Sequence, residues 1–173
     1  ARPCEGGWLL DGRVSALAFG QQAQAALVLA EAEGQPRLVL LELGAAQIRR
    51  VPGVLTHGEA VAEIEVQDLR IGAEQLLPGP ALDWLEPRAQ AALAALQLGV
   101  SAEHIRRTVA YVSEREQFGR PIGSFQAVQM SMADAHITLE ALRSSLWQLC
   151  YRLDAGLGSS AQALATAYLA CEA

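Results

Sequence analysis

The amino-acid sequence predicts an α+β fold, with a partial β-barrel or sandwich over residues 1–80 followed by an antiparallel α-helical bundle over residues 81–173. Two observations support this prediction. Short apolar runs lie between turn residues up to Pro80, whereas apolar residues beyond it recur at helical spacings. The chain has 173 residues, 51% of them hydrophobic, which is enough to bury a core.

Short strands are expected at the start of the first part. Residues 8–10 form an apolar run between two turn signals, Gly6-Gly7 and Asp11-Gly12. Residues 25–32 and 37–43 are two further runs, separated by a Glu-Gly-Gln-Pro segment that favours a tight turn. These two runs predict a β-hairpin with one buried face.

Residues 61–71 show a clearer alternation of apolar and polar side chains, as in a strand with one buried face. The alternation changes phase at Gln67-Asp68, which predicts a β-bulge or a strand break. Pro52-Gly53 and Pro78-Gly79-Pro80 are interpreted as turns, and the second is taken as the boundary between the two parts.

One long amphipathic helix is expected after this boundary, with Pro87 in its first turn and an end near Phe118-Gly119-Arg120-Pro121. Its apolar face is predicted to comprise Leu85, Ala89, Leu93, Leu96, Val100, Ile105, Val109 and Val112.

A second helix is expected from Ser124, its predicted N-cap, to Gly156, its predicted C-cap. Ser159 or Ser160 would then cap a third helix. The apolar face of the second helix is predicted to comprise Phe125, Val128, Met132, Ala135, Leu139, Leu142, Leu146, Leu149 and Leu153, and that of the third Leu164, Tyr168 and Cys171.

Charge and hydropathy exclude several classes of partner. The formal net charge is −6, so nucleic acid and anionic lipid are not expected partners. The longest apolar stretch, Ala25–Ala30, is far shorter than the roughly 20 residues of a membrane span. The first residues lack Met and a signal sequence, so we expect a fragment of a longer protein.

Metal and nucleophile sites are also not expected. Cys4, Cys150 and Cys171 lack Cys-x-x-Cys spacing, which fits small buried side chains in a reducing cytoplasm. His57, His104 and His136 form no helical pair and are expected at the surface or at an interface. The serines and paired acids lack catalytic context: Ser144-Ser145 lies within a helix, and Glu63/Glu65 and Glu114/Glu116 are expected to be solvated.

The segment between the first two helices is chemically distinctive. It brings Arg115, Phe118 and Gln126 to one helix–helix corner. A guanidinium suits a pyrophosphate, an aromatic face suits an adenine, and a glutamine both donates and accepts hydrogen bonds. The alternative is an αα-hairpin in which Phe118 and Phe125 are hydrophobic plugs, and the residues alone leave both interpretations open.

The sequence resembles the acyl-CoA dehydrogenase family, at the end of its middle β-domain and the start of its C-terminal helical domain. The segments that carry the resemblance are Gly6–Arg13 and Glu65–Ile71 in the first part and Tyr111–Ile122, Phe125–Gln129, Met132–Asp134 and Leu153–Gly156 in the second.

The resemblance implies a cofactor and partners. Arg115, Gln117 and Phe118 would contact the ADP portion of FAD, with Gln126 nearby, and in this family the flavin is held by a neighbouring subunit. The implied assembly is a homo- or hetero-oligomer. The implied reaction is α,β-desaturation of an acyl-CoA thioester in fatty acid, lipid or steroid side-chain catabolism, with electrons leaving to an electron-transfer flavoprotein in the cytoplasm.

The sequence departs from the family pattern at two places. The glutamate base of most members would lie beyond Ala173, and in other members it falls at the position of Ala89, with Glu86 nearby but not matching. The aromatic and hydroxyl residues that contact the flavin ring correspond to Ala16 and Ala18. Two hypotheses follow: an active acyl-CoA dehydrogenase, or a catalytically silent subunit that completes the FAD site of a heteromeric enzyme.

Overall fold

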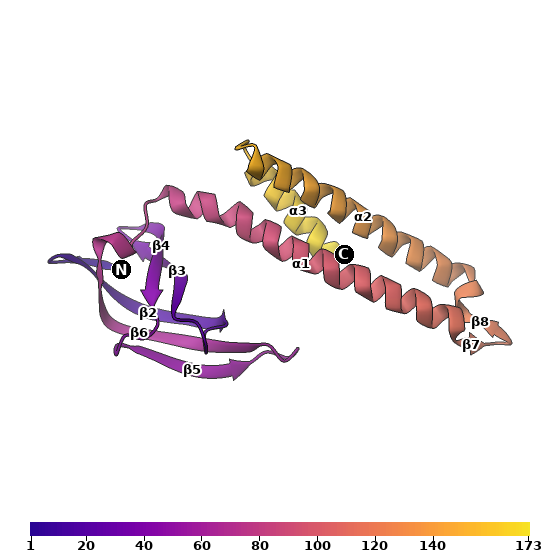
Figure 1. The fold of residues 1–173 in the computed structure, drawn as a ribbon, viewed down its shortest axis with the longest axis horizontal. Helices are drawn as coiled ribbons and strands as arrows, with labels where there is room; N and C mark the ends of the chain where they lie inside the picture. The colour runs from indigo at the N-terminus through magenta and orange to yellow at the C-terminus, as the bar shows by residue number, and fades with distance from the viewer. The chain divides into compact units, whose positions relative to one another are not determined.

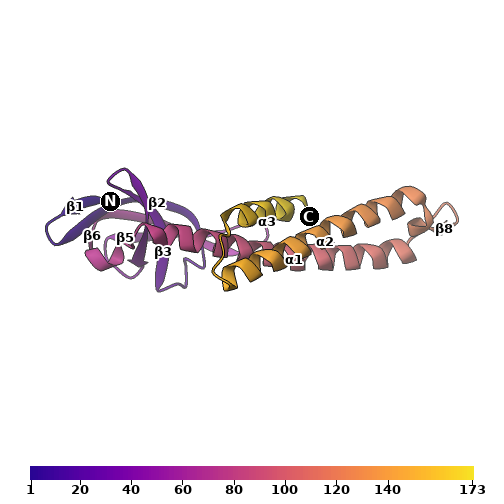
Figure 2. The ribbon, with the colours of Figure 1, turned by 90° about the horizontal axis from the view of Figure 1, so that it is seen from above.

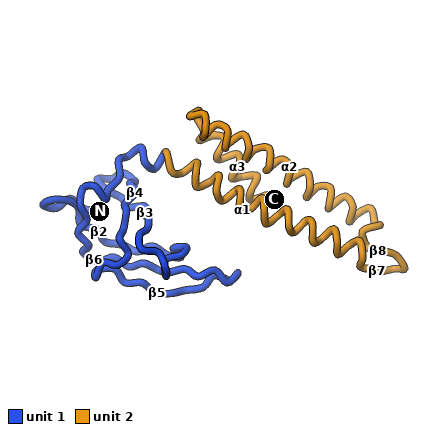
Figure 3. The backbone as a smooth tube through the Cα atoms, viewed as in Figure 1, with its two compact units in different colours: residues 1–83 blue, residues 84–173 orange.

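The computed structural model describes residues 1–173, which divide into two compact units, residues 1–83 and residues 84–173 (Figure 3). The first unit contains the two larger β-sheets, and the second contains most of the helical residues and one short β-hairpin (Figure 1). None of the helices carries an apolar stretch that would reach across a lipid bilayer.

The first unit is built from two antiparallel sheets. One sheet has the strand order β1-β2-β6-β5, and the other pairs β3 with β4. The strands are β1 (Arg2–Cys4), β2 (Gly7–Ala18), β3 (Ala25–Ala32), β4 (Gln35–Glu42), β5 (Ile48–Val54) and β6 (Ala60–Gly72). Together with the helices of the second unit, these two open sheets confirm the α+β fold class.

The predicted β-hairpin is present as β3 and β4, with Ala32 paired to Gln35 across a two-residue loop. Both loop residues have left-handed backbone, with φ of 54° at Glu33 and 72° at Gly34. Positive φ at both positions is the signature of the type I′ turn, whose twist matches that of the flanking strands.

The predicted bulge lies in β6, where the register with β2 shifts between the Leu10 and Gly12 pairs. Asp68 adopts φ of 50° there, and its N–H donates to Asp11 Oδ1 at 2.7 Å. This bond, together with the Arg2 guanidinium at 2.6 Å from Asp11 Oδ2, lowers the pKa of the Asp11 carboxyl. The carboxylate therefore fixes the backbone where the strand changes its buried face.

Two predicted turns are wrong. Asp11-Gly12 does not end a strand, because β2 continues through it to Ala18 by means of the irregular register. Pro52-Gly53 lies within β5, where Pro52 pairs with Ala62. The edge position of β5 explains the second error. Proline has no N–H to donate, and an edge strand tolerates it because one side of such a strand has no neighbouring strand to accept a bond.

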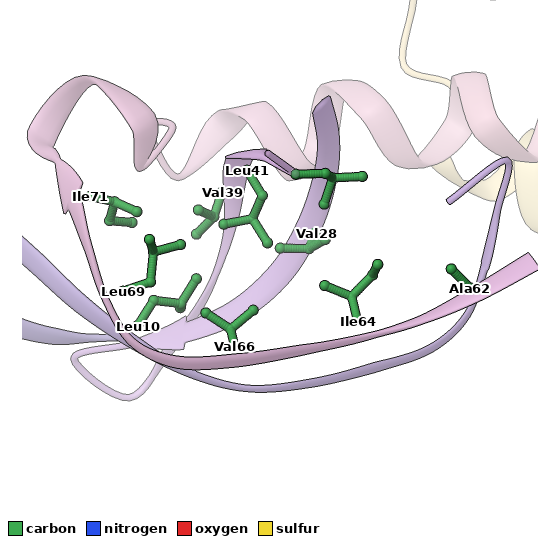
Figure 4. Packing of buried hydrophobic residues seen from close by; sticks show 10 residues of the cluster. Leu10, Val28, Val39, Leu41, Ala62, Ile64, Val66, Leu69 and Ile71 are labelled. Atoms are coloured by element: carbon green, nitrogen blue, oxygen red, sulfur yellow. The ribbon is translucent and has the colours of Figure 1, made fainter. Parts of the chain in front are cut away.

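The core of the first unit lies between the two sheets. Side chains from β2 and β6 point toward side chains of β3 and β4 (Figure 4). Val39, Leu41, Ala62 and Ile64 have no exposed surface at all. This packing confirms the buried face that the hairpin and the alternation in residues 61–71 predict.

The second unit contains three helices, α1 (Pro80–Glu114, which begins in the first unit), α2 (Gln126–Asp154) and α3 (Ser160–Glu172). Figures 1 and 2 show α1 and α2 side by side, with α3 returning along them. Their shared core contains Ala91 and Ala94 of α1, Leu142, Leu146 and Leu149 of α2, and Ala163 of α3. The helical bundle is therefore as the sequence predicts.

The ends of the helices differ from prediction. Pro80 takes the first position of α1, so Pro87 lies inside the helix and is buried. The N-cap of α2 is Phe125, because Ser124 belongs to a short 3₁₀ turn and its hydroxyl donates to the Pro121 carbonyl at 2.7 Å.

Gly156 follows the C-cap of α2, Ala155, and has φ of 65°. The N–H of Leu157 donates to the Arg152 carbonyl at 2.9 Å, and that of Gly156 to the Leu153 carbonyl at 3.4 Å. These two bonds form a Schellman motif, which needs left-handed backbone at the glycine.

The predicted apolar faces of α1 and α3 are wrong in their direction. Leu93 and Leu96 of α1 are 68% and 67% exposed, and Leu164 and Tyr168 of α3 are also exposed. Small residues face the shared core instead, because they let helix backbones approach closely. Cys150 and Cys171 are likewise exposed and Cys4 is half-buried, so the prediction of buried thiols is wrong.

A polar network joins α2 to α3. The hydroxyls of Ser145 and fully buried Thr166 lie 2.8 Å apart, and Gln162 Nε2 donates to Ser145 Oγ at 2.9 Å. Thr166 Oγ1 also donates to the Gln162 carbonyl at 2.8 Å. Every buried side-chain polar atom of the chain has a partner, as stable packing requires.

Candidate functional site

A short β-hairpin joins α1 to α2. Its strands are β7 (Glu116–Gln117) and β8 (Arg120–Pro121), and the N–H of Ile122 adds a bond to the Arg115 carbonyl at 2.8 Å. Residues 115–126, which contain this hairpin and the start of α2, are called the α1–α2 corner below. The α1 helix ends at Glu114, earlier than predicted, because this ladder replaces its next turn.

The loop of this hairpin is Phe118-Gly119, with φ of 55° and 76°. These values again define a type I′ turn. Glycine accommodates such a backbone without cost, whereas a bulky residue adopts it only under strain. Strain of this kind tends to persist at functional positions.

The Phe118 ring projects into solvent and is 91% exposed. It touches Phe125 edge to face, with centroids 6.0 Å apart and an interplanar angle of 89°. An aromatic plug would be buried among apolar side chains. The interpretation of Phe118 as a hydrophobic plug is therefore wrong for this chain, while Phe125 is half-buried and does pack at the corner.

The other predicted site residues also lie on the surface of the corner. Arg115 lies between α1 and β7, Gln117 ends β7, and Gln126 is the first residue of α2. All three are exposed. The structure thus brings all four predicted residues to one corner.

Arg115 has no carboxylate oxygen within 4.0 Å, and neither does Arg120. The ion-paired arginines of the chain lie elsewhere, as in the pairs Arg13–Glu63 and Arg49–Glu65. An arginine without an internal anion keeps all its donors available to an external one.

Arg120 is a further candidate site residue that the sequence motifs do not predict. Its guanidinium lies over the Phe125 ring, 4.0 Å from the centroid, in a cation–π contact. Arg120 pairs with Gln117 across the type I′ turn. The Phe-Gly pair in the sequence could have indicated this, because a two-residue hairpin loop places the residues on either side of it, Gln117 and Arg120, opposite each other.

The end of β2 carries the second set of positions that the family resemblance singles out. Ala16 and Ala18 are exposed and Leu17 is half-buried, so these three positions offer neither an aromatic face nor a hydroxyl. Ala16 has φ of 53° at a register shift of the strand. Phe19 follows with φ of 57° and is 68% exposed.

Two side chains pin the loop after β2. Arg50 of β5 donates to the Leu43 carbonyl at 2.6 Å and to the Ala23 carbonyl at 3.1 Å. Gln21 Nε2 donates to the carbonyls of Gly53 and Val61 at 2.9 and 2.8 Å. The bonds of Gln21 and Ala23 tie this loop to β5 and β6.

No carboxylate stands at the helical position that carries the base in some family members. Ala89 is an exposed residue of α1, and Glu86 lies three positions before it, where its Oε1 accepts from Gln90 Nε2 at 3.4 Å. His57, His104 and His136 are exposed, which confirms their predicted surface positions.

Comparison with known proteins places the chain in a family. Residues 88–173 match the family description "Acyl-CoA dehydrogenase, C-terminal domain". The acyl-CoA dehydrogenase FadE27 of Mycobacterium tuberculosis is 32% identical over 148 residues, which cover 85% of this chain and 40% of that protein.

Solved structures agree with this match. The crystal structure of the ChsE4–ChsE5 complex from Mycobacterium tuberculosis has a TM-score of 0.90 and 29% identity, over 99% of this chain and 47% of that one. A structure of PigA with FAD and proline has a TM-score of 0.85 and 26% identity, over 99% and 48%. The chain therefore spans less than half the length of these relatives.

Two open β-sheets followed by a helical hairpin with an aromatic, arginine-bearing corner define an incomplete acyl-CoA dehydrogenase fold. The chain belongs to the acyl-CoA dehydrogenase family.

Proposed function

We propose that this chain is part of an FAD-dependent acyl-CoA dehydrogenase and that its α1–α2 corner binds the ADP portion of FAD. The observation that carries the proposal is the exposed Phe118 ring, held on a left-handed backbone at the tip of a hairpin whose arginines have no internal anion. An aromatic ring held in solvent on a strained backbone contributes little to the stability of the fold. It is, however, available to stack on a flat ligand.

The residues of the corner fit the nucleotide end of FAD. The planar donor fork of Arg115 matches the oxygens of a diphosphate. The open face of Phe118 suits stacking on adenine, a contact that typically contributes about 1–3 kcal/mol per base. Gln117 and Gln126 are exposed amides beside them, able to donate to phosphate or ribose oxygens.

The flavin that meets this corner is proposed to be held by an adjoining subunit. The corner lies at the end of a helical hairpin, and residues 115–120 and Gln126 are exposed, so it presents these residues outward rather than into a cavity of its own unit. The similarity to the ChsE4–ChsE5 complex supports an oligomer of acyl-CoA dehydrogenase subunits.

The reaction proposed for the complete enzyme is α,β-desaturation of an acyl-CoA thioester from fatty acid, lipid or steroid side-chain breakdown. A bound flavin supplies the hydride acceptor, and an electron-transfer flavoprotein in the cytoplasm would receive the electrons. The residues of this chain bind and orient the cofactor. None of them is assigned as the base, since Ala89 cannot remove a proton.

A second candidate function rests on the end of β2. Ala16 and Ala18 do not fit a flavin ring, because they provide neither a surface to stack on nor a hydroxyl to donate a hydrogen bond. The alternative is therefore a catalytically silent subunit that completes the FAD site of a heteromeric acyl-CoA dehydrogenase. In that case the corner functions while this subunit's own β-unit holds no flavin.

Purification of the full protein, alone and with other acyl-CoA dehydrogenase subunits, separates the two candidates. Yellow colour and its bleaching by an acyl-CoA in the protein alone would exclude the silent subunit, whereas colour only in the mixture would support it. Arg115→Ala is expected to increase flavin loss on gel filtration while the thermal unfolding midpoint stays unchanged. Unchanged flavin retention would contradict the proposed role of the corner.

A further inference from the structure

We propose that Arg120 is a second phosphate-binding arginine of the α1–α2 corner, acting beside Arg115 on the diphosphate of the dinucleotide. This inference rests on the proposed function, because it names how the same site recognises its ligand. The supporting observations are the register of β7 with β8, the contact between Arg120 and Phe125, and the lack of internal anions around both arginines.

The register of the hairpin places two donor side chains on one face. Gln117 is the direct cross-strand partner of Arg120, and such partners project from the same face of a ladder. Arg115 directly precedes β7, and its carbonyl accepts from the N–H of Ile122 at 2.8 Å, which places it at the base of the hairpin. Gln117 and Arg120 therefore form one face of the hairpin, called the donor face below, and Arg115 lies at its base.

The acidic residue of the hairpin belongs to the opposite face. Glu116 pairs with Pro121, and both lie one position out of phase with the donor residues. The arginines consequently have no carboxylate to neutralise them, although the chain as a whole carries a net charge of −6. A local concentration of unpaired guanidinium in an acidic protein favours an external anion.

Phe125 holds the Arg120 guanidinium in place without using its hydrogen-bonding capacity. The guanidinium lies over the ring, 4.0 Å from its centroid, and the Arg120 side chain donates no hydrogen bond within the chain. A stacked guanidinium keeps its N–H groups in its own plane, directed away from the ring. Arg120 is thus oriented in advance for an oxygen-rich group.

The hairpin then divides the recognition of the ligand between its parts. The Phe118 ring at the tip meets the base, while the donor face meets the phosphates. Two arginines match a diphosphate better than one, since each phosphoryl group can accept from its own guanidinium. Substitution of Arg120 should therefore leave the affinity for a ligand without phosphates unchanged.

The test uses the full protein with the subunits that purify with it, after removal of its flavin, and measures dissociation constants for FAD, ADP and adenosine by calorimetry. Arg120→Gln is expected to weaken FAD and ADP binding about tenfold, as for one charge-assisted contact at a partly exposed site. Adenosine binding should change by less than about twofold. Arg120→Lys should recover part of the loss.

Matched variants separate a phosphate contact from a general effect of charge or folding. Arg70→Gln removes an exposed arginine of β6 that also lacks a carboxylate partner, and it should leave all three constants unchanged. Phe125→Leu should weaken ADP binding in the native background but add nothing to Arg120→Gln, because the ring acts through Arg120. Thermal unfolding of each variant shows whether the bundle is intact.

The outcomes distinguish this inference from the proposed function. If Arg115→Gln weakens ADP binding and Arg120→Gln does not, the proposed phosphate contact of Arg120 is refuted, while the proposed nucleotide site at the corner is supported. If Arg120→Gln weakens ADP and adenosine equally, Arg120 contacts the base and the inference is also wrong. If neither variant changes FAD or ADP binding, the proposed function itself fails.

Discussion

The exposed ring of Phe118 allows ligand binding to be separated from stability by one substitution, Phe118→Asn. Asparagine accepts left-handed backbone more readily than a bulky residue, so the φ of 55° costs less after the change. That relief amounts to about 1 kcal/mol. The lost edge-to-face contact with Phe125 costs about 0.5–1.5 kcal/mol. The free energy of unfolding should therefore stay within about 1 kcal/mol of its original value.

Ligand binding should respond very differently. A base stacked on an aromatic ring contributes about 1–3 kcal/mol, so the substitution should weaken FAD binding roughly tenfold or more. Chemical denaturation gives the stability and fluorescence titration of the flavin-free protein gives the affinity. Phe118→Tyr is the matched control, because it keeps the ring face and should retain binding close to the original.

One result would refute the reasoning about this ring. A loss of roughly 3 kcal/mol in unfolding free energy, the cost of truncating a phenylalanine in a core, would mean that Phe118 packs as a plug in the assembled protein. Unchanged FAD affinity together with that loss would leave the corner without a role in nucleotide binding.

Three further predictions concern the rest of the chain. Hydrogen bonds from Arg106 and, to a lesser extent, Arg107 lower the pKa of Glu103 from 4.5 to about 2. The ionised Glu103 therefore stabilises the folded state above pH 4.5, and this contribution is lost as the pH falls through about 2. A midpoint above 4 in a carboxyl titration by nuclear magnetic resonance would contradict this. Leu142→Ala should lower the unfolding free energy by about 2–5 kcal/mol in denaturant titrations, since Leu142 has no exposed surface. Gly156→Ala should cost about 1 kcal/mol in the same measurement because of its φ of 65°, and an unchanged midpoint would argue against the Schellman motif.

Local signals made the β-elements predictable where a short pattern determines the backbone. The Glu33-Gly34-Gln35-Pro36 segment and the phase change before Leu69 are both visible within a few residues. The predicted hairpin and the predicted bulge both occur, although the turn is confined to Glu33-Gly34 and β4 begins at Gln35. Pro52 shows the limit of such signals. A proline looks like a turn in sequence, but an edge strand accommodates it, and edge positions depend on the pairing of distant segments.

Helical periodicity predicted where the helices lie and which face of α2 is buried, but not which faces α1 and α3 bury. Leu93 and Ala94 are neighbours on α1, and the exposed leucine has the higher hydrophobicity while the alanine enters the core. Packing between helices selects for fit at close approach, which a hydropathy pattern does not encode. At the corner, the residue types indicated the chemistry, yet Arg120 emerged only from the register of β7 with β8.

The network of Ser145, Gln162 and Thr166 helps to determine the register in which α3 packs against α2. A shift of α3 by a single residue would move Thr166 out of reach of Ser145 and break the bonds that join the two helices, leaving the Thr166 hydroxyl only its bond to the Gln162 carbonyl within α3. Apolar contacts between small side chains are less directional and would discriminate less between such positions. These three polar side chains therefore favour one register of α3 on α2 over the neighbouring registers.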